Sequence, residues 1–203
     1  MGVNKMDKLI EMINAWAKER GLDKVDARTQ YTKLIEEQGE LAKAIMQKNI
    51  EGRSGVLDSI GDYQVTLIIY CLIRDIHIAF WKTVINPKEF TTEKLYMNLV
   101  SISSEIIANY NKGLVTNEIR SIENTFQLLS LVAGKYDTTL EDTLELAYNE
   151  IKDRKGKMVN GVFIKEDDLG STKDYERGFE DGKNHVFELI KNKFDLGGKS
   201  DEL

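Results

Sequence analysis

The sequence is poor in the residue types that most often cross-link a chain or carry catalysis. Its 203 residues include one proline, one cysteine (Cys71) and two histidines (His77 and His185). A single cysteine excludes an internal disulfide framework and a zinc cluster built from cysteines. The two histidines lie far apart in the sequence and leave little material for a histidine metal site or a Ser-His-Asp triad. Because one proline is too few for a typical β-sandwich or a long flexible linker, the composition favours helices.

The charge balance and the apolar runs exclude further classes of protein. Acidic residues outnumber basic ones by 34 to 28, whereas a general nucleic-acid binder needs a basic surface. The most apolar run, residues 65–73, is far shorter than the ~20 residues that span a membrane. Charges near the N-terminus interrupt any apolar segment of the secretory type. We therefore expect a cytoplasmic protein that binds neither nucleic acid nor membranes.

Apolar residues recur three and four positions apart through most of the chain, which predicts an all-α helical bundle. Gly21 is expected to end the first helix, and Asp26 and Ser54 to cap the second and third. Residues 158–165 contain a central Asn-Gly and predict a short hairpin or an extended loop. The predicted helices cover about 5–20, 26–49, 55–75, 88–111, 117–134, 139–154 and 173–194. We expect one domain over 1–170, non-helical near 158–170, followed by a C-terminal helix and a flexible tail over 171–203.

Two acidic groups on consecutive predicted helices form the most informative pattern. Glu37 and Glu40 are three apart and Glu36 and Glu40 four apart, so each pair shares a helical face. Asp58 and Asp62 share a face of the next helix, immediately before it becomes almost entirely apolar. Like charges at this spacing repel, and a divalent cation would reverse that cost. Carboxylates without histidine or cysteine suit a hard cation such as Mg²⁺ or Mn²⁺.

Two further observations bear on this cluster. Gly39 and Gly61 stand inside helices, where glycine costs about 1 kcal/mol against alanine. A close approach of helices beside the site would explain both glycines. The ordinary interpretation of acidic residues on a helix is a solvated face, and spacing alone does not decide between that interpretation and a metal site.

The same residues resemble a known family. The segments LIEEQGELAKAI (34–45) and VLDSIGDYQVTLI (56–68) resemble the MazG-like all-α nucleoside triphosphate pyrophosphohydrolases, whose signature is Glu-x-x-Glu, a spacer, and Glu-x-x-Asp on the next helix. Glu37 and Glu40 match the first half and Asp62 matches the last aspartate. Ser59 stands where the family usually has glutamate, and Asp58 would substitute for it, as in phage-type members. The resemblance extends to residues 13–22, 30–33 and 147–169, so it covers roughly 8–75 and 144–169.

The resemblance implies the fold of all-α nucleoside triphosphate pyrophosphatases and hydrolysis of a (deoxy)nucleoside triphosphate to the monophosphate and pyrophosphate. It implies Mg²⁺, with Mn²⁺ as a possible replacement, as the cofactor. The implied metal ligands are Glu37, Glu40, Asp58 and Asp62. The implied catalytic residues are Glu36, Glu37 and Glu40, where Glu36 holds the metals or orients the attacking water.

A basic group at the end of the sixth predicted helix has two interpretations. Cations there complement the helix dipole, which is the simpler one. The resemblance implies instead that they bind the β- and γ-phosphates, with an arginine contacting phosphate oxygens through two donors. The implied phosphate-binding residues are Lys33, Asn149, Lys152, Arg154 and Lys155. Lys33 alternatively forms a simple salt bridge with Glu37.

Trp16 and Cys71 have structural interpretations beside any functional one. Trp16 extends the apolar stripe of the first helix, a position more typical of a core residue, whereas the resemblance implies a nucleobase pocket near that helix. Cys71 lies in the apolar run and is expected to be buried and inert. Apolar surface in 95–107 and 126–132, together with the resemblance, predicts a homo-dimer or homo-tetramer.

Three hypotheses remain open from the sequence. The first is a nucleoside triphosphate pyrophosphohydrolase that controls the nucleotide pool, a hydrolase acting on phosphoric anhydrides. The second is phosphoribosyl-ATP pyrophosphohydrolase activity on the same fold. The third is a helical nucleotide-binding or scaffold protein without turnover, which Ser59 keeps open.

Overall fold

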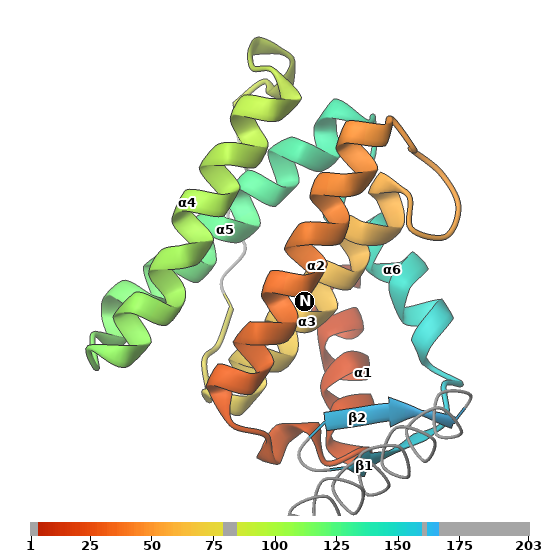
Figure 1. Ribbon diagram of the computed structural model, residues 1–203, viewed down its shortest axis with the longest axis vertical. Coiled ribbons are helices and arrows are strands. Elements are labelled where there is room, and N and C mark those ends of the chain that lie inside the picture. The colour runs from red at the N-terminus through yellow and green to blue at the C-terminus, as the bar shows by residue number, and fades with distance from the viewer. Residues whose placement is uncertain (1–3, 79–84, 160–161, 167–203) are drawn as a thin grey trace, which may run out of the picture. The chain divides into compact units, whose positions relative to one another are not determined.

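A computed structural model describes residues 4–78, 85–159 and 162–166 (Figure 1). It confirms the all-α class. The longer helices are α1 (Lys5–Glu19), α2 (Ala27–Gln47), α3 (Val56–Ile73), α4 (Thr92–Asn111), α5 (Val115–Lys135) and α6 (Leu140–Ile151). Short 3-10 turns, η1 (Leu22–Lys24) and η2 (Pro87–Glu89), precede α2 and α4, and strands β1 (Gly156–Val159) and β2 (Val162–Lys165) follow α6. The predicted helix over 173–194, and with it the predicted division at residue 170, lies outside the described residues.

The end of α1 and the starts of α2 and α6 are defined by residues next to them in the sequence. Gly21 follows α1 with φ of +70°, a left-handed conformation that glycine adopts at little cost. The Asp26 side chain caps α2 by accepting a hydrogen bond from the amide of Arg28. Thr139 caps α6 in the same way through the amide of Asp142.

Other helix boundaries differ from the prediction. Gly55, rather than Ser54, precedes α3, and the Ser54 amide donates to Asp58 Oδ2 at 2.8 Å. The Asp58 carboxylate, in the first turn of α3, therefore binds the backbone before the helix and takes the place of the cap that was expected from the Ser54 side chain. Helix α4 starts at Thr92 instead of about 88, because Pro87 opens a separate 3-10 turn and Thr91 supplies the cap. Helix α6 ends at Ile151, three residues before the predicted end.

Helix α3 is the centre of the core. It packs against α2, α6 and α1, and further against α5. By length and composition it is the one helix in the described part of the chain that could cross a membrane, but 78% of that stretch is buried inside the bundle. A helix that is apolar on nearly all sides and covered by neighbours is a core helix. Cys71 on α3 is buried, as expected.

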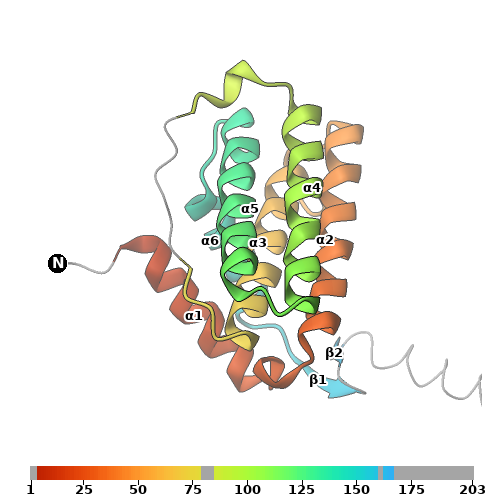
Figure 2. The same cartoon turned by 90° about the vertical axis from the view of Figure 1, so that its left-hand side faces the viewer.

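Helices α4 and α5 form an antiparallel pair beside α2 and α3 (Figure 2). The pair is tied to α3 through the fully buried Glu118 of α5, which accepts from Tyr70 Oη at 2.8 Å and from Arg74 Nε at 2.9 Å. It is tied to α2 through the Tyr31 hydroxyl, which donates to the carbonyl oxygen of Ser103 at 2.9 Å. Paired polar groups therefore hold α4 and α5 at a defined place in the bundle.

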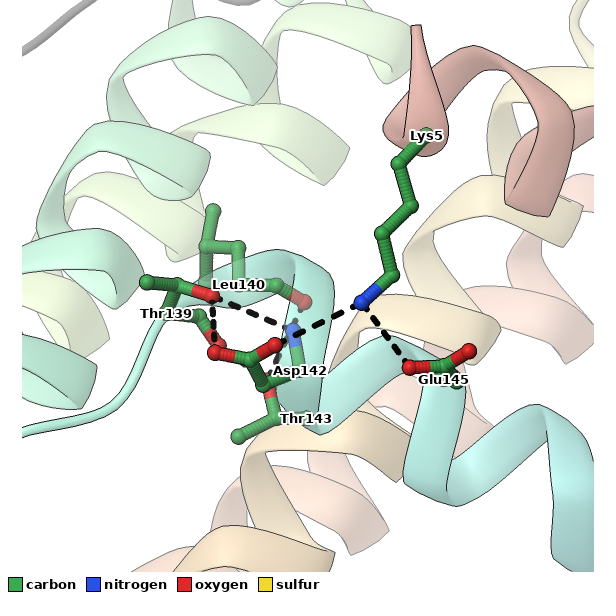
Figure 3. A network of polar contacts seen from close by, with 6 residues as sticks. All are labelled: Lys5, Thr139, Leu140, Asp142, Thr143 and Glu145. Carbon is green, nitrogen blue, oxygen red and sulfur yellow. Dashed lines mark hydrogen bonds and ion pairs between the residues drawn. The ribbon is translucent and has the colours of Figure 1, made fainter.

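Helices α1 and α6 are joined at both ends. Near the start of α1, Lys5 Nζ lies 2.8 Å from Glu145 Oε2 and 3.5 Å from Asp142 Oδ1 (Figure 3). At the other end, Trp16 Nε1 donates to the carbonyl oxygen of Ile151 at 2.9 Å. Because the Lys5 pairs are exposed and the Trp16 bond is buried, the second contact contributes more to the stability of this junction.

The described chain divides into two compact units. The first comprises residues 4–154 together with 162, and the second comprises 155–159 and 163–166. Strands β1 and β2 pair with each other, so the hairpin form of the prediction for 158–165 is confirmed. Within the second unit, the Glu166 amide donates to the carbonyl oxygen of Lys155 at 3.0 Å.

Candidate functional site

The predicted carboxyl cluster lies where α2 packs against α3, and its members differ in exposure. Glu37 on α2 and Asp58 on α3 are buried, with exposed fractions of 6% and 7%. Asp62, one turn after Asp58, is half-buried, whereas Glu36 and Glu40 are exposed. The ordinary interpretation, a solvated acidic face, therefore applies to Glu36 and Glu40 only. The other three carboxyls lie at the margin of the core, where an uncompensated charge is costly.

The Asp62 carboxyl is the most perturbed acid of this group. Burial, and then the charges of Glu37, Asp58 and Glu150, raise its pKa to about 7, while Arg154 opposes the rise. These neighbours come from α2, α3 and α6 or the turn after it. Three helices thus bring charged side chains to one carboxyl, which is a feature of functional sites.

Glu37 and Asp58 have partners that orient them. Lys33 Nζ lies 3.0 Å from Glu37 Oε1 and 2.8 Å from Glu36 Oε2, so it bridges two turns of α2. Burial raises the pKa of Glu37 against the lowering effect of Lys33, and the charges of Glu40 and Glu36 add to the rise. Asp58 keeps one oxygen on the Ser54 amide, which fixes its carboxyl at the start of α3.

The two helical glycines have different explanations. A Cβ added at Gly61 would overlap the carbonyl oxygen of Thr143 and stand 2.7 Å from the Cβ of Ala147. Gly61 therefore permits the close approach of α6 to α3 beside Asp62, as predicted. The prediction is wrong for Gly39, because no atom of the described residues lies within 4 Å of a Cβ at that position. Nothing in the structure explains a glycine there.

Glu150 belongs to the group although the sequence pattern did not include it. Its carboxylate raises the pKa of Asp62, and its Oε1 lies 3.1 Å from Arg154 Nη2. The only local signal was the spacing of four between Glu150 and Arg154. Its proximity to Asp62 depends on how α6 crosses α3, which periodicity cannot specify.

The predicted phosphate-binding residues fall into separate groups. Arg154 lies close enough to Asp62 to affect its pKa. Lys33 is on α2, where its ammonium is paired with Glu36 and Glu37 as the simpler interpretation expected. Lys152 Nζ donates to Asn149 Oδ1 at 3.0 Å on the exposed side of α6. Lys155 belongs to the second unit.

Trp16 of α1 is buried against the end of α6. Its indole nitrogen donates to the carbonyl oxygen of Ile151, and the Arg20 guanidinium lies over its ring. This is the position of a core residue, which the pattern of the first helix favoured. A contact of Trp16 with a nucleobase stays a prediction.

The oxygen donors at this junction are of the type that hard divalent cations prefer. The side chains at the α2–α3 junction offer carboxylate oxygens. Burial first, and then the charges of Glu37, Asp58 and Glu150, raise the pKa of Asp62 to about 7, and a bound cation would relieve the part that is repulsion between acids. In the described part of the chain, no three Asp, Glu, His or Cys side chains are grouped closely enough to hold an ion as they stand. Ser59, at the position where the resemblance expects glutamate, is buried and carries no charge, which leaves Asp58 as the acid in this turn.

Comparisons with models of protein families, with curated proteins and with solved structures found no match to this chain. The resemblance to MazG-like proteins therefore rests on the sequence segments that carry it, and it stays a prediction.

Proposed function

We propose that the protein is a nucleoside triphosphate pyrophosphohydrolase that converts (deoxy)nucleoside triphosphates to the monophosphate and pyrophosphate. The observation that carries the proposal is the Asp62 carboxyl, whose pKa is raised to about 7 by burial and by the charges of Glu37, Asp58 and Glu150. Buried acids that repel one another reduce stability, and a site that needs a cation is a physical reason to retain them.

In this proposal Glu37, Glu40, Asp58 and Asp62 hold Mg²⁺, and Mn²⁺ can replace it because both prefer oxygen ligands. Bound there, the ion would neutralise triphosphate oxygens and lower the pKa of a coordinated water. Glu36 is exposed beside Glu37 and would orient that water. Lys33 links Glu36 to Glu37, so it would keep the two carboxylates in register and contact phosphate as a point charge.

The basic residues at the end of α6 would bind the departing part of the substrate. Arg154 has the planar donors that match phosphate oxygens, and Lys152 and Asn149 would add charge and hydrogen bonds. Water adds to the α-phosphorus and the bond to the bridging α–β oxygen breaks. The β- and γ-phosphates leave as pyrophosphate and the monophosphate remains, so nucleotide-pool control is the biological role we propose.

The test is pyrophosphate release from a panel of ribo- and deoxyribonucleoside triphosphates and phosphoribosyl-ATP, with Mg²⁺, with Mn²⁺ and with EDTA. We expect turnover that requires a divalent cation, is abolished by Glu40→Gln and is retained by Ser59→Ala. Glu93→Gln, which changes an exposed glutamate in the first turn of α4, is the matched control and should be neutral.

The outcomes separate the three hypotheses. Release from phosphoribosyl-ATP alone would assign the second activity. Nucleotide binding without turnover on any substrate would favour the binding or scaffold protein and overturn the proposal.

Two further properties accompany the proposed function, a cytoplasmic location and assembly into a homo-dimer or homo-tetramer. A monomeric mass measured by light scattering would contradict the oligomer.

A further inference from the structure

The turn that follows α6 is held by side chains of α1. The carbonyl oxygen of Ile151 accepts from Trp16 Nε1 at 2.9 Å and from the Arg154 amide at 2.8 Å. The carbonyl oxygen of Arg154 accepts from Arg20 Nη2 at 2.9 Å and from Arg20 Nε at 3.3 Å. The last carbonyls of a helix and of the turn after it have no partners within the helix, so these bonds from α1 decide how the turn is placed.

Arg20 is itself held in a fixed orientation. Its side chain is 15% exposed, and its guanidinium carbon lies 4.7 Å from the centre of the Trp16 ring. Its Nη1 donates to the carbonyl oxygen of Trp16 at 3.2 Å and to Glu19 Oε2 at 3.1 Å. Every nitrogen of the guanidinium therefore has a partner, and the group acts as a rigid fork rather than as a mobile surface charge.

The held turn carries Arg154, whose charge acts on the carboxyl cluster. The Arg154 side chain is paired with Glu150 through Nη2 and acts on the Asp62 carboxyl. Its backbone is fixed at the carbonyl by Arg20 and at the amide by Ile151. The position of a side chain depends on the position of its backbone. The hydrogen bonds from Trp16 and Arg20 to the turn therefore determine where the Arg154 guanidinium lies.

We infer that Arg20 is a positioning residue that sets Arg154 for binding the phosphates of the substrate, and this inference rests on the proposed function. Arg20 acts through the backbone of the turn and touches no substrate group. Lysine cannot replace it, because one ammonium cannot make the two-pronged contact of Nε and Nη2 with one carbonyl while stacking on the Trp16 ring.

The experiment compares Arg20→Lys, Arg20→Ala, Arg154→Ala and the double variant Arg20→Ala/Arg154→Ala. For the substrate that the wild-type protein hydrolyses, Arg20→Ala should raise KM about tenfold with kcat within about twofold, the signature of lost phosphate binding. Arg20→Lys should resemble Arg20→Ala. The KM of the double variant should be no higher than the KM of Arg154→Ala alone, because Arg20 acts only through Arg154.

The matched control is Arg28→Ala. Arg28 also stacks on an aromatic ring, with its guanidinium carbon 5.1 Å from the centre of the Tyr110 ring, and also donates to an oxygen, Asn111 Oδ1. Removing it deletes the same kind of contact away from the turn after α6 and should leave KM unchanged. Amide hydrogen exchange supplies a readout independent of activity, since Arg20→Ala should accelerate exchange of the Arg154 amide and Arg28→Ala should not.

Binding of inorganic tripolyphosphate, measured by calorimetry, distinguishes a failure of the proposed function from a failure of the positioning role of Arg20. If the wild type binds tripolyphosphate but hydrolyses nothing, the proposed function fails, and non-additive losses of affinity in Arg20→Ala and Arg154→Ala would still support the positioning role. If turnover is present and the two effects add, or Arg20→Lys equals the wild type, the positioning role is overturned and the hydrolase stands. Absence of both turnover and binding overturns both.

Discussion

Gly61 of α3 lies against the carbonyl oxygen of Thr143 in α6, so closely that a Cβ on Gly61 would overlap it. This contact lets the two helices approach at the position next to Asp62. It thereby brings Glu150, two turns further along α6, within electrostatic reach of the Asp62 carboxyl. The absence of one side chain in α3 is thus a condition for the carboxyl cluster.

Gly61→Ala is expected to destabilise the protein. The added methyl group would overlap backbone rather than a flexible side chain, so α6 must shift, and overpacking of this kind costs about 1–3 kcal/mol. Urea unfolding followed by circular dichroism measures the free energy of unfolding. Gly39→Ala is the matched control. Its Cβ would contact none of the residues that the structure describes, and alanine is the better helix former, so this substitution should stabilise the protein by about 1 kcal/mol. Equal effects of the two substitutions would contradict the close approach.

The stability of the metal-free protein is expected to fall as pH rises towards neutrality. The pKa of Asp62 is raised from 3.8 to about 7, so between these values the folded state keeps a proton that the unfolded state has released. This contribution is fully present below about pH 4 and is lost as pH rises through about 7. One proton corresponds to a slope of at most about 1.4 kcal/mol per pH unit.

Urea midpoints measured from pH 4.5 to 8 in EDTA test this pH dependence. Asp62→Asn should flatten the profile and leave the contribution of Glu37, whose pKa is shifted in the same direction. Asp7→Asn, at an exposed position in the first turn of α1, should keep the wild-type slope. A wild-type slope in Asp62→Asn would show that Asp62 is not the titrating group.

Arg74→Ala is expected to cost about 3 kcal/mol of stability. It removes the cation from Glu118, which is fully buried, and leaves that carboxylate with the Tyr70 hydroxyl as its remaining hydrogen-bond donor in the described part of the chain. Lys88→Ala is the control, because the Lys88–Asp137 pair is exposed on both sides and should contribute less than about 0.5 kcal/mol. Comparable losses in the two variants would contradict the distinction between a buried and an exposed pair.

The thiol of Cys71 is expected to be unreactive in the folded protein. The side chain is buried in α3, and burial raises the pKa of the thiol, so little thiolate forms near neutral pH. Because the chain has one cysteine, Ellman's reagent reports on this site alone. The reaction should be slow in buffer and complete in urea. Reaction in buffer at the rate of the unfolded chain would show that α3 is accessible.

The amino-acid sequence predicts the helical class, most helix positions and the two helices that carry the acidic residues. These properties follow from interactions between residues a few positions apart: apolar spacing along α1 to α6, the caps at Asp26 and Thr139, and the left-handed Gly21. At the start of α3 the expected cap was wrong because Asp58 accepts a hydrogen bond from the amide of Ser54.

Which of these residues lie together depends on how the helices pack against one another. Gly39 and Gly61 look alike in the sequence, yet only Gly61 faces a neighbouring helix. The sequence does not indicate that Glu150 lies near Asp62 or that Arg20 contacts the turn after α6, because both contacts depend on how α6 packs against α3 and α1. The packing of side chains across three helices sets these distances, and no period along a single helix encodes where another helix will lie.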